Sequence, residues 1–394
     1  MRDKAEADDM PTCAKTALVP KLRFPEFRTA ERWGLKTLAE ICLLITNGKA
    51  NAQDHEEHGD YPLFDRSAVI KKSSKFIFDA EAVILPGEGM RFVPKYFRGK
   101  FNLHQRAYAL MHHQADGRFL YQSLDHFQDA LAKKAVKSTV LSLRLPIVAN
   151  FSIGVPHITE QLKIAECLSS LDEVIAAQAR KVEALKKHKK GLMQQLFPRE
   201  GETQPRLRFP EFRDTGEWRV RRVSQFARVT TGDKDTQNKA CGGEYPFFVR
   251  SQTVERIDSY SYDGEAVLTS GDGVGVGKNF HYIKGKFDFH QRVYCIFEFS
   301  DDVSGQFFYF YFSQQFGERV TRMSAKNSVD SVRMAMITDM PILLPPLPEQ
   351  HKIVLCLSSL DSLIIAGAEK LEALKIHKKG LMQQLFPSRA EDNA

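Results

Sequence analysis

The chain has 394 residues, a formal net charge of +7, 43% hydrophobic residues and 27% charged residues. Its length predicts two or more domains, and its hydrophobic share excludes wholesale disorder. The modest positive charge permits a polyanionic partner without requiring one.

No continuous run approaches the roughly 20 apolar residues of a membrane span, and the N-terminus has no apolar signal core. We therefore expect a cytoplasmic protein with no membrane contact. The six cysteines form no C-x-x-C pair and no zinc-ligand spacing with histidine, so no metal site is predicted. We expect these cysteines to be small buried residues in a reducing compartment.

In chain order, residues 1–20 carry mixed charges and are expected to form a disordered tail. Aromatic and β-branched runs broken by Gly, Asp and Asn then predict two α+β domains, at residues 21–156 and 207–346, with a linker at 199–206. Strands are predicted at residues 75–78, 82–85, 266–268 and 293–297. Helices are predicted at residues 119–134 and from residue 306 to at least 315.

Two further regions, residues 157–198 and 347–388, are predicted to be helical, and a short tail follows at 389–394. Their apolar residues recur every three or four positions, which is an a/d heptad seam. The seam residues are Leu168, Leu171, Ile175, Val182, Leu185, Leu192 and Leu196 in the first region, and Leu357, Leu360, Ile364, Leu371, Leu374, Leu381 and Leu385 in the second. So narrow a seam needs one partner helix. A parallel or antiparallel pair within the chain, or a helix of another subunit, would each satisfy it.

At about 1.5 Å per residue, the first of these helices would be roughly 55 Å long, against about 34 Å for one turn of B-DNA. Helices of this length suit two modules held about one to one and a half DNA turns apart.

The chain repeats itself at an offset of about 185 to 189 residues over nearly its whole length, which indicates duplication of one large module. The shared motifs are Leu-Arg-Phe-Pro-Glu-Phe (22–27 and 207–212), the two tryptophans Trp33 and Trp218, Tyr-Pro with Arg-Ser (61–67 and 245–251), His-Gln-Arg (104–106 and 290–292), Glu-Gln (160–161 and 349–350), and Lys-Lys-Gly-Leu-Met-Gln-Gln-Leu-Phe-Pro (189–198 and 378–387).

These motifs, with the Pro-rich run at 344–350, resemble the specificity subunits of type I restriction-modification enzymes over both copies. The first copy departs from the pattern at residues 153–159, where Ile-Gly-Val-Pro-His-Ile-Thr replaces the Pro-rich run. The resemblance implies two target-recognition domains with pseudo-twofold symmetry, joined by two long helices in an intrachain coiled coil. Each domain would read one half of a bipartite site in double-stranded DNA.

The resemblance also implies partners: two methyltransferase subunits docked on the helices, and restriction-translocase subunits that cleave. S-adenosylmethionine and ATP would bind those partners, and this chain would bind neither. Because the helical repeats are nearly identical while the loops of the two domains differ, we expect equal docking surfaces and an asymmetric target.

No catalytic motif is recognisable, so we expect a non-enzymatic chain. The Gly-rich stretch at 271–278 fails as a P-loop, because Lys278 is followed by Asn279, and fails as a dinucleotide fingerprint, because Val276 replaces the third Gly. Its counterpart at 87–91 has lost most of the glycines. We interpret the stretch as a plain turn or as a turn whose backbone lies close to DNA.

The recurring His-Gln-Arg triplets cannot easily specify different bases in two different half-sites, so a shared role is expected. Either Arg106 and Arg292 contact phosphates, or the triplets hold the fold together. Arg66 and Arg250 follow the same logic.

Base reading is expected where the copies differ, although any single lysine can equally be a solvated surface residue. The candidates are Asn47, Lys49, Lys71, Lys72, Arg91, Lys95 and Lys137 in the first domain, and Lys234, Gln237, Asn238, Lys239, Lys278, Lys326 and Asn327 in the second.

The basic run at 180–190 could follow the DNA spacer, but solvated helix flanks or subunit contacts are the favoured interpretation. The competing function is a non-catalytic coiled-coil scaffold whose globular domains bind protein. DNA affinity that falls with salt would distinguish the two.

Overall fold

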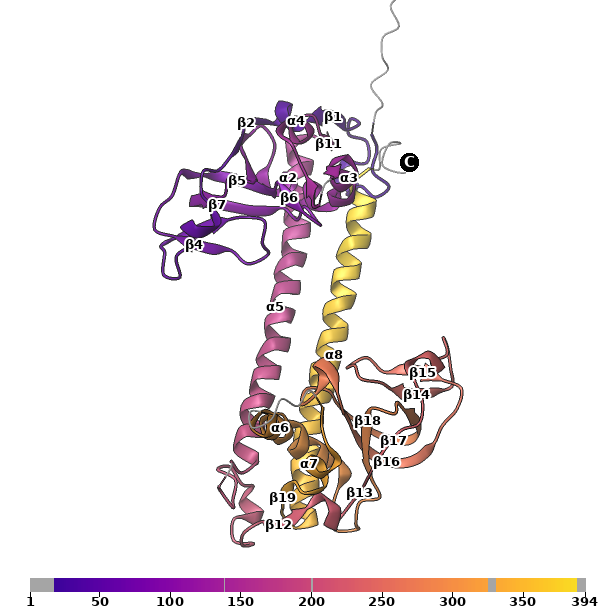
Figure 1. Ribbon diagram of the computed structural model, residues 1–394. Helices are drawn as coiled ribbons and strands as arrows, with labels where there is room; N and C mark the ends of the chain where they lie inside the picture. The colour runs from indigo at the N-terminus through magenta and orange to yellow at the C-terminus, as the bar shows by residue number, and fades with distance from the viewer. Residues whose placement is uncertain (1–17, 138, 200, 325–330, 388–394) are drawn as a thin grey trace, which may run out of the picture. The chain divides into compact units, whose positions relative to one another are not determined.

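The computed structural model describes residues 18–137, 139–199, 201–324 and 331–387 (Figure 1). The chain divides into two compact units, Met1–Ala179 with Glu369–Ala394, and Arg180–Ala368. Both borders fall inside long helices, α5 (Ile158–Leu196) and α8 (Leu347–Leu385). Each unit therefore contains one globular domain, the first part of the helix that follows it, and the last part of the other repeat's helix.

The core of unit 1 is a six-stranded sheet in the order β2-β8-β5-β7-β3-β4, antiparallel except between β3 and β7. Its strands are β2 (Cys42–Asn47), β3 (Tyr61–Phe64), β4 (Lys71–Ser73), β5 (Phe78–Pro86), β7 (Lys95–Leu103) and β8 (Ala107–His113). Successive residues of β5 point to opposite faces, as the two-residue period of a strand requires. Val83 and Leu85 belong to one hydrophobic cluster, and Ala82 and Ile84 to another.

Shorter elements complete unit 1. They are β1 (Gly34–Thr37), α1 (Leu38–Ile41), β6 (Glu88–Gly89), α2 (Gly117–His126), α3 (Gln128–Lys134), β9 (Val136–Lys137), β10 (Leu141–Ser142), α4 (Leu145–Ala149) and β11 (Ser152–Val155), with one-turn 3-10 helices at Pro25–Phe27 and Ala52–Asp54. Strands β1 and β11 pair with each other, and β10 lies between β6 and β9.

Unit 2 repeats this plan with the sheet order β13-β18-β16-β17-β14-β15. Its elements are β12 (Arg219–Arg222), β13 (Arg228–Thr231), β14 (Tyr245–Phe248), β15 (Glu255–Ile257), β16 (Tyr262–Ser270), β17 (Phe280–Phe289), β18 (Val293–Phe297), α6 (Gly305–Ser324), α7 (Met334–Thr338) and β19 (Pro341–Leu344), with 3-10 helices at Pro210–Phe212, Val223–Gln225, Thr236–Asn238 and Gly273–Gly275.

The predicted α+β class, the duplicated modules and the two joining helices are confirmed, while several local predictions differ from the structure. Residues 75–77 precede β5 and form no strand, and Phe76 instead packs its ring on Tyr61 with centroids 4.9 Å apart. The predicted helix at 119–134 is two helices that meet at Phe127. Leu18, expected in the tail, is buried and forms a β-bridge with Trp33, so it belongs to the packed part of unit 1.

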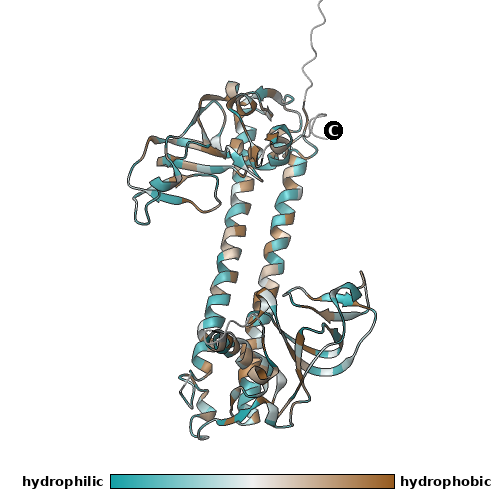
Figure 2. Cartoon of the chain, in the orientation of Figure 1, coloured by the Kyte–Doolittle hydropathy of each residue, from teal (hydrophilic) through white to brown (hydrophobic). Residues whose placement is uncertain are grey.

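The seam residues lie on the inner faces of α5 and α8. In unit 1, Leu168 of α5 shares one buried cluster with Met382 and Leu385 of α8. In unit 2, Leu357 of α8 shares a cluster with Leu196 of α5. The start of each helix thus lies beside the end of the other, which is an antiparallel arrangement within the chain. Figure 2 shows hydrophobic and hydrophilic residues alternating along both helices.

A lysine interrupts each seam and pairs with an aspartate of the other helix. In unit 1, Lys378 Nζ lies 2.7 Å from Asp172 Oδ1 and 3.7 Å from Asp125 Oδ2. In unit 2, Lys189 Nζ lies 2.7 Å from Asp361 Oδ2 and 4.9 Å from the ring centre of Phe310. Burial raises the pKa of Asp125, and Lys378 partly opposes that shift.

The repeated Glu-Gln motif fixes the start of each helix. Arg208 of the Leu-Arg-Phe motif donates two hydrogen bonds to Glu349, both 2.8 Å, and Arg23 pairs in the same way with Glu160 at 2.6 and 2.7 Å. All four side chains are almost fully buried, so each pair is screened little by solvent.

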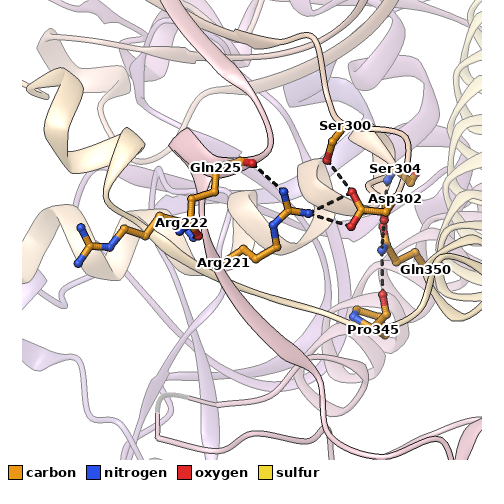
Figure 3. Close-up of polar contacts among 8 residues, drawn as sticks. All are labelled: Arg221, Arg222, Gln225, Ser300, Asp302, Ser304, Pro345 and Gln350. Atoms are coloured by element: carbon orange, nitrogen blue, oxygen red, sulfur yellow. Dashed lines mark hydrogen bonds and ion pairs between the residues drawn. The ribbon is translucent and has the colours of Figure 1, made fainter.

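The neighbouring Gln350 binds the loop before α6. Its Oε1 accepts from Ser304 N at 2.9 Å, and its Nε2 donates to the carbonyls of Asp302 and Pro345, also at 2.9 Å (Figure 3). Arg221 of β12 adds a two-pronged ion pair with the Asp302 carboxylate at 2.8 and 3.0 Å. The start of α8 is therefore tied to the body of unit 2.

The repeated exit motif packs into the other repeat's domain. Trp33 of unit 1 contacts Phe386, the phenylalanine of the second Leu-Phe-Pro, with ring centroids 6.3 Å apart. In unit 2, Phe197 of the first Leu-Phe-Pro and Trp218 both contact Phe307. The repeated start and the repeated end of the module therefore meet across repeats, not within one repeat.

Helix α8 departs from the expectation that no segment could cross a membrane. By length and composition alone it is apolar enough, with a window of mean hydropathy 1.4. Much of that character comes from aliphatic residues on the side away from the seam, among them Leu355, Leu363, Ile365 and Ile376. On the seam side the same helix carries the ion-paired Lys378, which suits a helix packed against protein.

The cysteines are only partly as expected. Cys42 and Cys295 are buried, and burial raises the pKa of the Cys42 thiol to about 12. Cys241 is exposed, and Cys167 and Cys356 are intermediate. Cys13 lies outside the described residues.

Candidate nucleic-acid interface

The two sheets present an equivalent loop between their longest antiparallel strands. We call residues 87–94 (between β5 and β7) and residues 271–279 (between β16 and β17) the tip loops. Each begins with a glycine whose N–H donates to the carbonyl of the His-Gln-Arg arginine, from Gly87 to Arg106 at 2.9 Å and from Gly271 to Arg292 at 2.8 Å. A Cβ added at Gly87 would lie 2.7 Å from the Arg106 oxygen, so glycine is required there.

A carboxylate in each tip loop binds the same arginine through its side chain. Arg106 Nη1 lies 2.7 and 2.8 Å from the oxygens of Glu88. Asp272 accepts from both Arg250 and Arg292. Burial alone would raise the pKa of Asp272, but the two arginines hold that pKa below its ordinary value. The tip loops are thus anchored by backbone and by charge.

The rest of the His-Gln-Arg triplet holds the adjoining turn. His104 Nδ1 accepts from the backbone N–H of Arg106 at 3.1 Å, and His290 Nδ1 accepts from that of Arg292 at 2.9 Å. Burial lowers the pKa of both imidazoles, which favours the neutral ring that can accept. Gln105 donates to Asn51 at 2.7 Å. These contacts match the fold-holding interpretation of the triplets.

The outer ends of these arginines remain open to solvent. The side chains of Arg106 and Arg292 are 58% and 61% exposed in spite of their ion pairs. Contact with a phosphate therefore stays a prediction for both.

Three predicted residues of unit 1 gather around one open pocket of about 790 Å³. Arg66, Arg91 and Lys95 line it together with the apolar Met90 and Val93. Lys95 Nζ donates to the carbonyl of Ser67 at 2.8 Å, and burial lowers its pKa. At the equivalent place in unit 2, His281 Nε2 lies 3.0 Å from the carbonyl of Ser251, so the backbone contact persists while the side chain differs.

The other candidates lie in separate places. Four already have a polar partner: Asn47 donates to the carbonyl of Gln105, Lys71 pairs with Asp65 at 2.8 Å, Lys234 with Asp233 at 3.5 Å, and Lys239 with Glu255 at 3.3 Å. Asn238 caps its own turn by accepting from Asp235 N at 2.7 Å. The exposed candidates away from the pocket are Lys49, Lys72, Lys137, Gln237 and Lys278. Lys326 and Asn327 lie outside the described residues.

The basic run on α5 contributes to a second open pocket, of about 960 Å³, within unit 2. Lys186, Lys190 and Arg199 line it with Glu318 and Asp361. The acidic residues balance part of the positive charge. The described residues contain no cluster of three or more His, Cys, Asp or Glu side chains arranged to hold a metal ion.

The sequence reasoning missed the acidic partners Glu88 and Asp272 and the exposed tip residues Met90 and Val274. A signal for the first pair existed, because an acidic residue follows the first glycine in both copies. That signal was hidden because the two loops differ in length and in glycine content.

The architecture and this duplicated surface define a protein with two homologous recognition modules carried on shared helices. A family model described as the type I restriction modification DNA specificity domain matches residues 30–187 and 215–375. The chain therefore belongs to the type I restriction-modification specificity family.

Individual relatives agree with this assignment. The EcoDI specificity subunit of Escherichia coli is 32% identical over 139 residues, covering 35% of this chain and 31% of that protein. The MjaVIII specificity subunit of Methanocaldococcus jannaschii is 23% identical over 401 residues, covering 92% of this chain and 94% of that protein.

Solved structures share the fold. The S subunit of a type I restriction-modification system from M. genitalium aligns with a TM-score of 0.69 at 14% identity, covering 95% of this chain and all of that one. A chain from a study of complex assembly and conformational transition of the type I R-M system aligns with a TM-score of 0.52 at 17% identity, covering 90% and 98%. The predicted role, recognition of a DNA sequence for a type I restriction-modification enzyme, is confirmed by the family assignment.

Proposed function

We propose that the chain reads an asymmetric, bipartite site in double-stranded DNA, one half with each unit. The observation that carries this proposal is the same scaffold presented twice with different side chains. Lys95 of unit 1 is replaced by His281, and the paired Asp65 and Lys71 are replaced by Val249 and Glu255. A reader of two identical half-sites would need no such differences, because base contacts specify while phosphate contacts only position.

In this proposal the helices set the length of the unread spacer and carry the partners. Two methyltransferase subunits would dock on α5 and α8, and restriction-translocase subunits would join that core. The exposed aliphatic residues of α8, such as Leu355 and Ile365, support docking of protein on the side away from the seam. The proposed setting is the cytoplasm, with no membrane partner.

We further propose that this chain performs no chemistry itself. S-adenosylmethionine and ATP would bind the partner subunits, and the methyltransferase would extrude the target adenine, since a base must leave the stack to react. The Gly-rich tip loop of unit 2 is committed to ion pairs with Arg250 and Arg292, which supports a structural role over cofactor binding.

The test is a genome-wide map of methyladenine in cells with and without this gene, with the methyltransferase gene kept in place. We expect one split, asymmetric motif that disappears with the gene. A motif that persists without the gene contradicts the proposal.

Binding of a duplex that contains the motif is then titrated with salt. The logarithm of affinity should fall linearly with the logarithm of salt concentration. Absence of that slope would favour the scaffold alternative, in which the globular domains bind protein only.

A further inference from the structure

The most exposed aliphatic side chain of each tip loop points into solvent. Met90 is 78% exposed and Val274 is 94% exposed. They occupy the same place in their units, three residues after the glycine that bonds the His-Gln-Arg arginine. A single exposed aliphatic residue needs no explanation, but the same exposure at equivalent places in two loops of different sequence does.

Both side chains sit on firmly held backbone. The tip loops are fixed by the Gly87 and Gly271 hydrogen bonds and by the Glu88 and Asp272 ion pairs described above. In unit 2 the loop is also tied by Val332 N, which donates to the carbonyl of Gly271 at 2.7 Å. An exposed side chain on a fixed support loses little backbone entropy when it makes a contact.

Arginines lie near both residues, together with the carboxylates of Glu88 and Asp272. Around Met90 lie the exposed Arg66 and Arg91, which line the same pocket. In unit 2, Arg250 and Arg292 bind the Asp272 that precedes Val274 by two residues, and the exposed Lys278 follows in the same loop. An aliphatic tip with exposed arginine or lysine side chains nearby suits a surface that combines phosphate contacts with an apolar contact.

Resting on the proposed function, we propose that Met90 and Val274 are specificity-determining residues that contact thymine methyl groups in the two half-sites. The C5-methyl of thymine is the apolar feature of the major groove, and it distinguishes T·A from the other pairs when an apolar side chain meets it. A phosphate is not an alternative partner, because the side chains of Met and Val cannot donate a hydrogen bond to its oxygens. Each unit therefore reads at least one thymine through its tip loop.

The experiment uses the full chain assembled with its methyltransferase subunits and duplexes that carry the mapped motif. Each thymine of a half-site is replaced in turn by deoxyuridine, which removes only the methyl group. For the unaltered protein we expect affinity to fall about fourfold at one position in each half-site. Val274→Ala should abolish that thymine preference in one half-site only, and Met90→Ala in the other only.

Two controls truncate an exposed aliphatic side chain to alanine elsewhere. Val220→Ala alters an exposed valine on β12 of unit 2, and Leu43→Ala alters an exposed leucine on β2 of unit 1. Both should keep every thymine preference. The slope of affinity with salt should be unchanged in all four variants, because an apolar contact releases no counterions.

The proposal is overturned if Val274→Ala and Met90→Ala keep the full preference for thymine over deoxyuridine. It is also overturned if 2-aminopurine fluorescence shows base unstacking that disappears in these variants, since that indicates insertion between base steps. If the unaltered assembly does not bind the unsubstituted duplex in a salt-dependent way, the proposal that the chain reads DNA is itself refuted. These results separate failure of the tip contact from failure of the proposed function.

Discussion

At the scale of single residues, burial lowers the pKa of both His-Gln-Arg histidines, His104 and His290. His290 is almost fully buried, its Nδ1 accepts from Arg292 N, and burial lowers its pKa. A group whose pKa is lower in the folded state binds fewer protons there than in the unfolded chain. Its contribution to stability is therefore present above pH 6.5, the ordinary histidine value, and is lost as pH falls through the folded-state pKa.

His290→Asn tests this. The Asn Oδ1 can accept from the same backbone N–H without titrating, so the free energy of unfolding should fall less between pH 7.5 and pH 5.5 in the variant than in the parent. Thermal unfolding at the two pH values measures it. His377→Asn, on the exposed surface of α8, is the control for replacing a histidine by asparagine. A variant as sensitive to acid as the parent would contradict the assignment.

Residue roles were only partly predictable from the sequence. Recurrence of His-Gln-Arg indicated a shared role, and the contacts of His104 and Gln105 are of the fold-holding kind. The sequence did not reveal the partner of Arg106, because Glu88 lies 18 residues away and meets it only where the tip loop packs beside the turn after β7. Contacts of this kind depend on the order of strands in the sheet, and no local sequence pattern encodes that order.

At the scale of elements, the buried ion pairs anchor each helix to its domain. Glu349→Gln would leave the guanidinium of Arg208 buried without its counter-ion, and breaking such a pair costs about 3–5 kcal/mol. We expect faster hydrogen exchange throughout unit 2. Glu211→Gln is the control, because the Glu211–Lys352 pair is exposed and screened by solvent, so its loss should change stability much less. Equal effects of the two changes would show that burial of the pair does not matter.

The two seam lysines, Lys378 and Lys189, should contribute differently to the free energy of unfolding. Lys378 balances Asp172 and Asp125, whereas Lys189 balances Asp361 and rests on the ring of Phe310. Lys378→Met should cost about 2 kcal/mol, less than a fully buried pair because the carboxylates are partly exposed. Lys189→Met should cost less, since one carboxylate is left instead of two. Denaturant unfolding of both variants shows which of them loses more stability.

The Lys378→Met variant should also respond to pH in a defined direction. Without the lysine, the already raised pKa of Asp125 rises further, so the folded state binds more protons than the unfolded chain. Stability should therefore recover as pH is lowered toward 5 and fall as pH rises. A variant that is equally unstable at pH 5 and pH 8 would exclude this cause.

The long helices were the elements best predicted from sequence, because a heptad pattern sustained from Leu168 to Leu196, and again from Leu357 to Leu385, has few alternatives. Their direction was left open, since a seam of Leu168, Ile175 and Val182 suits any partner of matching pattern. It is decided by the ends, where Phe197 and Phe386 pack into the domain of the other repeat. Packing of that kind depends on tertiary contacts and leaves no periodic signal.

At the scale of the whole molecule, both units depend on both helices. The borders after Ala179 and after Ala368 fall at equivalent positions of α5 and α8. The domain borders expected from sequence followed composition, and composition cannot reveal that a helix begins in one unit and ends in the other. A change at these two points alters the helices without touching either recognition surface.

The proposed spacer role can be tested at those points. Duplicating residues 173–179 in α5 together with residues 362–368 in α8 adds one heptad to each helix and keeps the seam in register. Seven residues add about 10 Å of helix, or about three base pairs of B-DNA. The methylation map should therefore show the same two half-sites with a spacer about three base pairs longer. Duplication in one helix alone is the control, and it should abolish methylation because the Lys189–Asp361 or Lys378–Asp172 contact can no longer form in register. An unchanged spacer, or altered bases within the half-sites, would show that the helices do not set the distance between the two readers.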